Sequence, residues 1–283
     1  VIWESRTGVG GLLKTEPDWV PGKVKTKMKK LMIAAMAVLW GTVGFADVES
    51  ANVVGYTTKA AGANLNWYAP QFFTVGANTT DINDIKLDDG GTGTVGWGDS
   101  MQIVGPLGNA TEVYSYWDAS MDQTGSATAC YWGDAEGRPV SVSFDAGEGI
   151  ALDNGSELAY SIVNSGDVSR DEVCFDARAN LNWSGNPFPA AINLNAVTLD
   201  DGGANTVGWG DSLQVVGPLG NATEVYSYWD ASMDPTLTAT TCYWGDAEGK
   251  PVDVTLDPGA GFAIDNGSEL TFKIRIACPY KAK

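Results

Sequence analysis

An internal repeat constrains the fold of this chain more than any other feature of its sequence. The stretch TVGWGDSMQIVGPLGNATEVYSYWDASMD, which begins at Thr94, returns from Thr206 with only two substitutions, an offset of 112 residues. Nearer the front of the two copies, ANLNW at Ala63 matches ANLNW at Ala179. A chain that carries one unit twice is expected to fold as two copies of one arrangement of secondary structure.

Within each copy the apolar residues alternate with a period of two. In PVSVSF, Val140, Val142 and Phe144 fall on one face, and Ser141 and Ser143 fall on the other. This alternation is typical of a half-buried strand. Similar short runs predict roughly seven or eight strands per copy, as in sandwiches and barrels. The sequence therefore predicts an all-β fold of two tandem β-sandwich or jelly-roll-like modules of about 110 residues each.

Two hairpins and one helical turn are predicted inside the first copy. MQIV and TEVYSYW lie on either side of GPLGN, which suits a hairpin loop. A second hairpin is expected at Asn154 and Gly155, because both residues tolerate the positive φ of a type I′ turn. Residues 81–86 are expected to form a single helical turn.

A hydrophobic segment near the front of the chain predicts export. Met28 is followed by two lysines, an apolar run from Leu31 to Val43 and small residues around Phe45, which is the order of a secretory signal peptide. A transmembrane anchor is the alternative, but the run is shorter than the roughly 20 residues that span a bilayer. We therefore expect cleavage after Ala46 and no membrane span in the mature protein.

These features divide the chain into four parts. Residues 1–27 precede the initiator-like Met28 and are expected to be an upstream extension that is not native, and residues 28–46 are the predicted signal peptide. The polar segment NSGDVSRDE has no counterpart at the end of the second copy, which predicts a linker. The two β-modules are accordingly expected at residues 47–167 and 168–283.

Charge and composition narrow the classes of function. Without residues 1–46 the chain keeps 10 basic and 32 acidic residues, a net charge of −22. Such a surface repels nucleic acid and anionic lipid. The chain has no histidine, which removes Ser-His-Asp and Cys-His catalysts and the commonest transition-metal ligand. No carboxylate stands in an apolar setting that would raise its pKa, so we predict that the protein is not an enzyme.

The four cysteines are predicted to form disulfides, because an exported protein meets an oxidising compartment and no CxxC spacing is present. Pairing Cys130 with Cys174 and Cys242 with Cys278 would preserve the repeat. Buried free thiols and a Cys130–Cys242 bond between the modules are the alternatives, since geometry decides whether two cysteines can be bridged.

Tryptophans that stand next to carboxylates are the candidates for carbohydrate contact. Each module carries four tryptophans, and two of them occur in a Trp-Gly-Asp pattern. An amphipathic ring beside an acceptor suits a sugar face, although aromatic rings also fill the cores of small β-modules, and Trp117 is expected in the core. The candidates are Trp97 with Asp99, Trp132 with Asp134, Trp209 with Asp211, and Trp244 with Asp246.

Acidic loops are the candidates for calcium binding, since calcium needs several carboxylate and carbonyl oxygens from flexible loops. Asp88 and Asp89 precede a pair of glycines in the first copy, and Asp200 and Asp201 do so in the second. No loop matches the D-x-[DN]-x-[DN]-G pattern, and Asp-Gly pairs also form ordinary turns. Calcium is therefore the one cofactor that the sequence suggests.

The expected mature start, DVESANVVGYTTKAAG from Asp47 to Gly62, resembles the opening of a group of uncharacterised exported tandem-repeat proteins of environmental bacteria. These proteins are similar to this chain in a SAN-x-VGY opening, a strand pair near a GNA-type loop and a Gly-x-Gly strand before the end. The resemblance brings no activity and no catalytic residue.

We expect an exported structural, adhesive or matrix-type repeat protein in the periplasm, at the cell surface or outside the cell. The alternative is a duplicated carbohydrate-binding protein that uses the Trp97 and Trp209 loops, with calcium organising the acidic loops. Duplication suits both, because two weak sites on one chain gain through effective concentration. The expected partner is a glycan or another surface protein, and not nucleic acid.

Overall fold

A computed structural model describes residues 54–90, 98–203 and 210–280. The predicted signal peptide and the predicted upstream extension lie outside these residues, so both stay predictions. Across the described ranges, no helix has the length and apolar character needed to cross a membrane.

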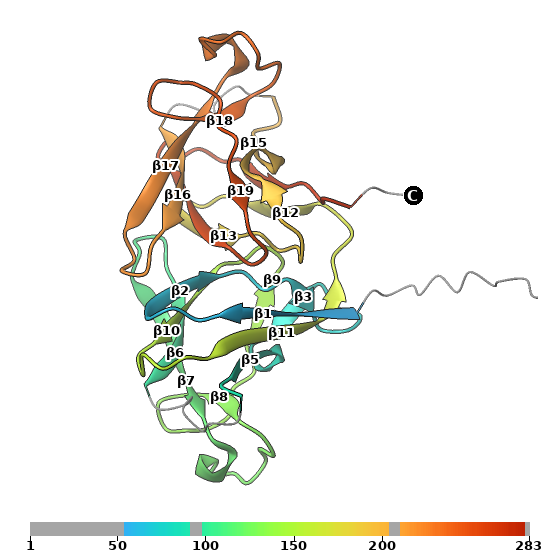
Figure 1. Ribbon diagram of the computed structural model, residues 1–283, viewed down its shortest axis with the longest axis vertical. Helices are drawn as coiled ribbons and strands as arrows, with labels where there is room; N and C mark the ends of the chain where they lie inside the picture. The colour runs from blue at the N-terminus through green and yellow to red at the C-terminus, as the bar shows by residue number, and fades with distance from the viewer. Residues whose placement is uncertain (1–53, 91–97, 204–209, 281–283) are drawn as a thin grey trace, which may run out of the picture. The chain divides into compact units, whose positions relative to one another are not determined.

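Antiparallel strands dominate the described part of the chain, so the predicted all-β class is confirmed (Figure 1). In the first repeat they form a five-stranded sheet, a four-stranded sheet and a strand pair. The five-stranded sheet has the order β2 (Asn64–Tyr68), β10 (Ile150–Asn154), β6 (Asp99–Val104), β7 (Ala110–Trp117) and β8 (Tyr131–Gly133). The four-stranded sheet contains β1 (Val54–Ala60), β11 (Ser161–Val168), β3 (Phe72–Phe73) and β5 (Ile85–Asp88), and the pair is β4 (Thr79–Asp81) with β9 (Ser143–Asp145).

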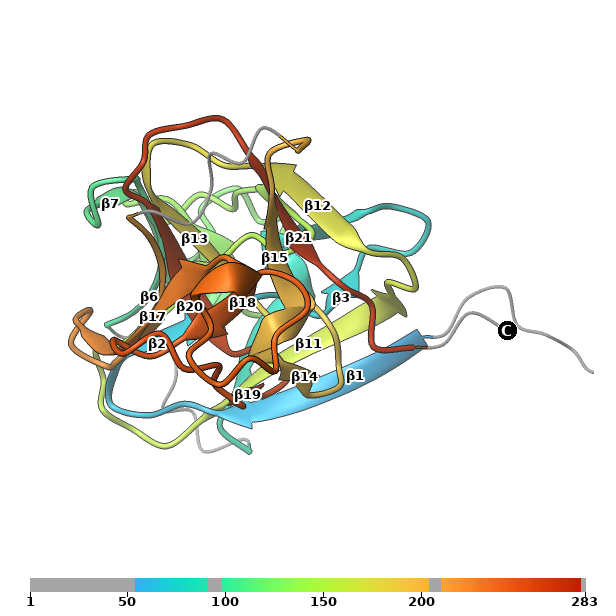
Figure 2. The same cartoon turned by 90° about the horizontal axis from the view of Figure 1, so that it is seen from above.

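The second repeat follows the same plan with a smaller second sheet. Its five-stranded sheet has the order β13 (Asn180–Gly185), β20 (Gly261–Asn266), β16 (Asp211–Val216), β17 (Ala222–Trp229) and β18 (Tyr243–Gly245). Its three-stranded sheet contains β12 (Val173–Asp176), β21 (Lys273–Ile276) and β15 (Val197–Asp200), and its strand pair is β14 (Ile192–Asn193) with β19 (Thr255–Leu256). Figure 2 shows β1 alongside β11, and β21 between β12 and β15.

Short 3-10 turns occur at equivalent positions of the two repeats. Each is preceded by an Asp or Asn whose side chain accepts a hydrogen bond from the backbone N–H two residues later, an N-cap that satisfies a free donor. The turns within the described residues are η1 (Ile82–Asp84), η2 (Ala119–Met121), η3 (Leu194–Ala196) and η4 (Ala231–Met233). The helical turn predicted at residues 81–86 is therefore confirmed as η1.

The two predicted hairpins have different outcomes. Strands β6 and β7 pair directly around the GPLGN loop, so that hairpin is confirmed. The hairpin predicted at Asn154 and Gly155 is wrong, because β10 pairs with β2 and β6 whereas β11 pairs with β1, β3 and β5. The turn is a corner between two sheets, fixed by the buried Asn154 side chain, which donates to the carbonyl oxygens of Gly62 and Leu158.

The four larger sheets of the described residues are arranged like the blades of a propeller, so the prediction of two sandwich or jelly-roll modules is wrong at this level. A period of two shows which residues form strands, but it does not show how the sheets pack. Isolated antiparallel bridges join the repeats at Tyr68 with Ala260 and at Glu148 with Ser184.

Each repeat has its own apolar core with a tryptophan in it. Trp132 and Trp244 are repeat equivalents with no exposed surface. Their indole nitrogens donate to the carbonyl oxygens of Ile85 and Val197, both at 2.7 Å, so the polar atom of each buried ring is satisfied. The predicted inward face of PVSVSF is confirmed at Phe144, which is 1% exposed.

A stack of two tryptophans joins the two repeats at a contact that we call the seam. Trp67 on β2 and Trp183 on β13 are repeat equivalents, and their ring centroids lie 4.3 Å apart with 14° between the planes. The indole nitrogen of Trp67 donates to the carbonyl oxygen of Gly217 at 3.0 Å, and that of Trp183 donates to Gly105 at 2.9 Å. Each ring thus finds its polar partner in the opposite repeat.

The backbone repeats this exchange beside the rings. The N–H of Leu65 donates to the carbonyl oxygen of Pro218, and the N–H of Leu181 donates to that of Pro106, both at 3.1 Å. Both acceptors lie in the hairpin loops that follow β6 and β16. When residue i of one copy contacts residue j of the other, and residue j of the first copy contacts residue i of the second, the contact is isologous, as in a two-fold dimer. The seam is therefore an internal pseudo-two-fold interface.

Glycine permits the close backbone approach at the seam. A Cβ on Gly261 would lie 2.8 Å from the backbone carbonyl carbon of Trp67, and a Cβ on Gly149 would lie 2.6 Å from the carbonyl oxygen of Ser184. Gly149 and Gly261 are repeat equivalents, so both halves of the seam depend on the same missing side chain.

Replacing either stacked tryptophan is expected to destabilise the whole described fold. Trp67→Ala and Trp183→Ala should each lower the free energy of unfolding by about 3–5 kcal/mol, because each removes a large packed ring. The double variant should lose less than the sum, by about 0.5–1.5 kcal/mol, because the first substitution already breaks the stack. Urea denaturation measures the free energy of unfolding of the two single variants and the double variant.

The matched control is Trp117→Ala, at the far end of β7 from the seam. Its effect should add to that of Trp67→Ala. Additivity between Trp67→Ala and Trp183→Ala would contradict the account of the seam.

Candidate functional site

The predicted sugar-contacting tryptophans separate into two groups. Trp97 and Trp209 lie outside the described residues, so their role stays a prediction. Trp132 and Trp244 have no exposed surface and lie in the two cores, so the prediction that they contact sugar is wrong. Trp117, expected in the core, is half-buried on the opposite face of its sheet, against Gly133.

The carboxylates two residues after Trp97 and Trp209 in the sequence form hydrogen bonds to neighbouring loops. Asp99 and Asp211 are each 1% exposed. One oxygen of Asp99 accepts from the Ser156 hydroxyl at 3.0 Å, and Asp211 accepts from Ser268 at 2.9 Å. Buried side chains of this kind cannot reach a ligand at the surface, which corrects the predicted role of both.

Asp134 and Asp246 organise a surface turn in each repeat. Asp134 accepts from the backbone N–H of Arg138 at 2.9 Å, and that bond, with the guanidinium beside it, holds the pKa of Asp134 below its ordinary value. Asp246 accepts from the N–H of Lys250 at 2.8 Å. The tryptophan two residues earlier is buried in both repeats, so neither Trp132 nor Trp244 lies at the surface beside its predicted acceptor.

The acidic loops predicted for calcium form hydrogen-bonded turns. Asp88 and Asp200 each accept from the N–H two residues later at 2.9 Å, and Asp201 does the same with Gly203. Asp200 also accepts from Arg275 Nε at 2.7 Å. In the part of the chain that the structure describes, which includes Asp89, no three acidic or cysteine side chains are grouped to hold a metal ion.

The four cysteines are free thiols, so the predicted disulfides are wrong. The physical reason concerns Cys174, which lies in β12 and therefore in a sheet of the second repeat, on the exposed face of that strand. Cys130 packs against the core of the first repeat, and Cys278 packs against the core of the second. Cys242, the equivalent of Cys130, is exposed.

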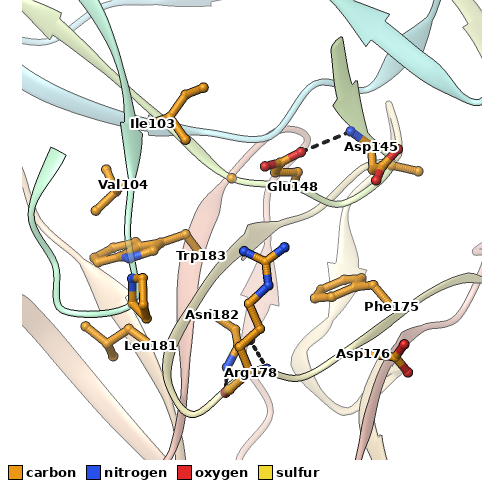
Figure 3. A pocket seen from close by; sticks show the side chains of 13 residues that line it. Ile103, Val104, Asp145, Glu148, Phe175, Asp176, Arg178, Leu181, Asn182 and Trp183 are labelled. Atoms are coloured by element: carbon orange, nitrogen blue, oxygen red, sulfur yellow. Dashed lines mark hydrogen bonds between the residues drawn. The ribbon is translucent and has the colours of Figure 1, made fainter. Parts of the chain in front are cut away.

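A cavity of about 560 Å³ opens at the seam and is the candidate functional site (Figure 3). The first repeat contributes the end of β6, the following Pro106 and the loop from Asp145 to Gly149. The second repeat contributes the segment from Phe175 on β12 to Trp183 on β13. This volume lies within the roughly 300–1,000 Å³ of small-molecule sites.

Glu148 forms one wall of the cavity and is held in place by the seam. Its carboxylate accepts from the backbone N–H of Asp145 at 3.1 Å, and its backbone forms the bridge with Ser184. The next residue, Gly149, donates to the carbonyl oxygen of Trp183 at 3.1 Å. Burial raises the pKa of Glu148 above its ordinary value, whereas the hydrogen bond from the Asp145 N–H and the Arg178 charge lower it, and the Asp145 carboxylate adds to the rise. This raised pKa corrects the expectation that no carboxylate of the chain has such a setting.

Arg178 directs its guanidinium into the cavity, between Phe175 and Trp183, with Glu148 beyond it (Figure 3). Its backbone is anchored on the buried Asn182, whose side chain accepts from the Arg178 N–H at 2.7 Å and donates to its carbonyl oxygen at 2.8 Å. The cavity therefore combines a cation with an anchored backbone, a hydrogen-bonded carboxylate and two aromatic walls.

Lys59 lies at the pseudo-equivalent place on the other side of the seam, where the cavity has Phe175. Its ammonium donates to the carbonyl oxygens of Trp67 at 3.5 Å and Gly259 at 3.4 Å and lies 5.9 Å from the centre of the Tyr68 ring. Burial lowers the pKa of Lys59. The two sides of a nearly symmetric seam thus differ in their chemistry.

No protein-family model, no curated protein and no solved structure matches this chain. The interpretation of the site accordingly comes from its own geometry.

Glu148, Phe175 and Arg178 were not predicted from the sequence, because they lie outside the motifs that the two copies share. A usable signal was present where the sequences of the two copies differ. Glu148 is aligned with Ala260 when the sequences of the two copies are compared, within a stretch where most neighbouring residues are identical or similar. The difference between the copies at this position is the signal that could have pointed to the cavity.

In each repeat another carboxylate, Asp122 or Asp234, makes the stability of the fold depend on pH. Asp122, 9% exposed, accepts from the hydroxyl and the N–H of Thr124 and from the N–H groups of Ser126 and Ala127, at 2.7–2.8 Å. These bonds, with the Thr124 hydroxyl first, hold the pKa of Asp122 well below its ordinary value. Asp234 makes the equivalent contacts.

We expect Asp122→Asn combined with Asp234→Asn to weaken the fold at neutral pH and not in acid. An amide would set N–H groups against backbone N–H donors. The wild-type contribution is complete above the unfolded pKa of about 3.9 and is lost as the pH falls through the lower folded pKa. Urea midpoints from pH 7 downward should converge for variant and wild type, whereas the exposed control Asp171→Asn should follow the wild type throughout. Parallel curves for the double variant would contradict this assignment.

Proposed function

We propose that this chain is an exported structural or adhesive protein that holds two copies of one surface in a fixed relation. The observation that carries the proposal is the seam, in which reciprocal indole hydrogen bonds and the stack of Trp67 on Trp183 join the repeats. Export through the signal peptide predicted at residues 28–46 is part of the proposal, as is the absence of an enzymatic activity.

The duplicated surface that we assign to adhesion lies on the two β-hairpins. Leu107 and Leu219, at the equivalent hairpin loops, are 78% and 79% exposed. Val113 and Val225, on the following strands, are 53% and 55% exposed. A single exposed apolar residue needs no explanation, but here one pair of apolar side chains is presented twice, on hairpins whose bases are fixed by the seam.

A fixed pair of weak contacts suits attachment to an extended partner. When the first contact has formed, the second becomes intramolecular, and the overall binding exceeds either contact alone. The strongly acidic surface disfavours anionic partners. We therefore propose a glycan surface or another surface protein as the partner, rather than nucleic acid.

Retention on surfaces tests this function. We expect the mature chain, residues 47–283, to be retained on cellulose or polystyrene films in a quartz-crystal microbalance. Leu107→Ser or Leu219→Ser alone should weaken retention, and the double variant should lose about 100-fold or more, because avidity is lost together with the second contact.

The matched control is Val75→Ser, which changes an apolar residue that is 64% exposed and lies outside both hairpins. It should retain the wild-type behaviour. Absence of wild-type retention on both films, or equal retention by the double variant, would count against an adhesive role.

Carbohydrate binding is the second candidate, and the seam cavity is the observation that favours it. Its mixture of Glu148, Arg178 and aromatic walls suits a hydroxyl-rich ligand. This candidate site uses other residues than the predicted Trp97 and Trp209 loops.

A further inference from the structure

We propose that the seam cavity binds a short neutral oligosaccharide, and that the chain carries this site once although its fold is duplicated. The inference rests on the carbohydrate-binding role given above as the second candidate. It does not depend on the adhesive role of the hairpins.

The first step of the argument is the asymmetry of the seam. The two copies share the stacked tryptophans and the hairpin loops, which build the interface on both sides. They differ at the cavity, where Glu148 corresponds to Ala260, Phe175 to Lys59 and Arg178 to Gly62. Joining the repeats does not require these three side chains, because the other half of the seam forms without them.

The second step is that the corresponding place on the other side of the seam carries different groups. Lys59 donates there to two backbone carbonyl oxygens, and Ala260 and Gly62 offer no polar side chain. The two sides of the seam therefore provide an internal comparison within one molecule.

The third step is the match between the cavity and a sugar. Sugar hydroxyls both donate and accept, so they can bond to the carboxylates of Glu148 and Asp145 and to the guanidinium of Arg178. Phe175 and Trp183 supply apolar ring surface for the C–H faces of a pyranose. The third carboxylate, Asp176, pairs with Lys273 at 3.1 Å. With carboxylates in excess of cations around it, the cavity favours a neutral ligand over an anionic one.

The fourth step is that the carboxylate of Glu148 is positioned before a ligand arrives. The Asp145 N–H and the Ser184 bridge position Glu148, and the buried Asn182 holds the backbone of Arg178. A carboxylate held in this way loses little conformational freedom on binding, which improves affinity.

Titration of the mature chain with maltose, cellobiose and xylobiose tests the proposal, by calorimetry and by the fluorescence change of Trp183. We expect saturable binding of at least one disaccharide, weakened about 10- to 100-fold in Glu148→Ala/Arg178→Gly, because hydrogen bonds to charged groups are lost. These substitutions install the residues of the other side of the seam, Ala260 and Gly62, and circular dichroism and thermal unfolding confirm that the variant is folded. Arg178→Ala alone, which changes an exposed side chain, serves as a second variant.

Two controls locate the site. Gly62→Ala changes the equivalent of Arg178 on the other side of the seam, where a Cβ would meet Asn66 Oδ1 at an ordinary 3.6 Å, and should leave binding unchanged. Trp97→Ala/Trp209→Ala should also leave it unchanged. Binding lost in that tryptophan variant but kept in Glu148→Ala/Arg178→Gly would overturn the seam site in favour of the loops.

Two further outcomes would overturn the proposal. One is that none of the three disaccharides binds. The other is that diglycine, whose two charged ends suit Arg178 and Glu148, binds in their place. Neither result bears on retention by the Leu107 and Leu219 hairpins, so the two proposals fail separately.

Discussion

The stack of Trp67 on Trp183 is the interaction on which the rest of the structure depends. It removes two large rings from water and gives each indole N–H its acceptor in the opposite repeat. Those acceptors, Gly105 and Gly217, lie at the bases of the hairpin loops. The contact therefore joins the repeats, sets the position of the two hairpin tips and forms the edge of the cavity.

Duplication gives this fold two kinds of position. Residues that both copies share, such as the stacked tryptophans and the seam glycines, build the pseudo-two-fold contact. Residues that differ, such as Glu148 against Ala260, break the symmetry at one point and create one cavity. Stability resides in the shared set and the candidate chemistry in the divergent set, so a change at the cavity is compatible with an intact seam.

The sequence predicted local structure well and long-range structure poorly. Alternation of apolar residues, the GPLGN loop and the capped turn after Asp81 depend on neighbours in the chain, and the structure contains all three. The hairpin predicted at Asn154 was wrong because a turn pattern does not show which sheet the next strand joins. The predicted sugar contact of Trp132 and the predicted disulfide of Cys174 were wrong for a related reason, since burial and sheet membership are set by residues far away in sequence. The cavity was missed because its walls come from both repeats.

Calorimetry of the mature chain tests the central claim, that the seam makes the two repeats one cooperative unit, most directly. If the claim holds, the protein unfolds in a single transition whose calorimetric enthalpy equals its van't Hoff enthalpy. Two repeats that unfold independently would give a calorimetric enthalpy about twice the van't Hoff value even if their transitions overlap, and that result would contradict the account.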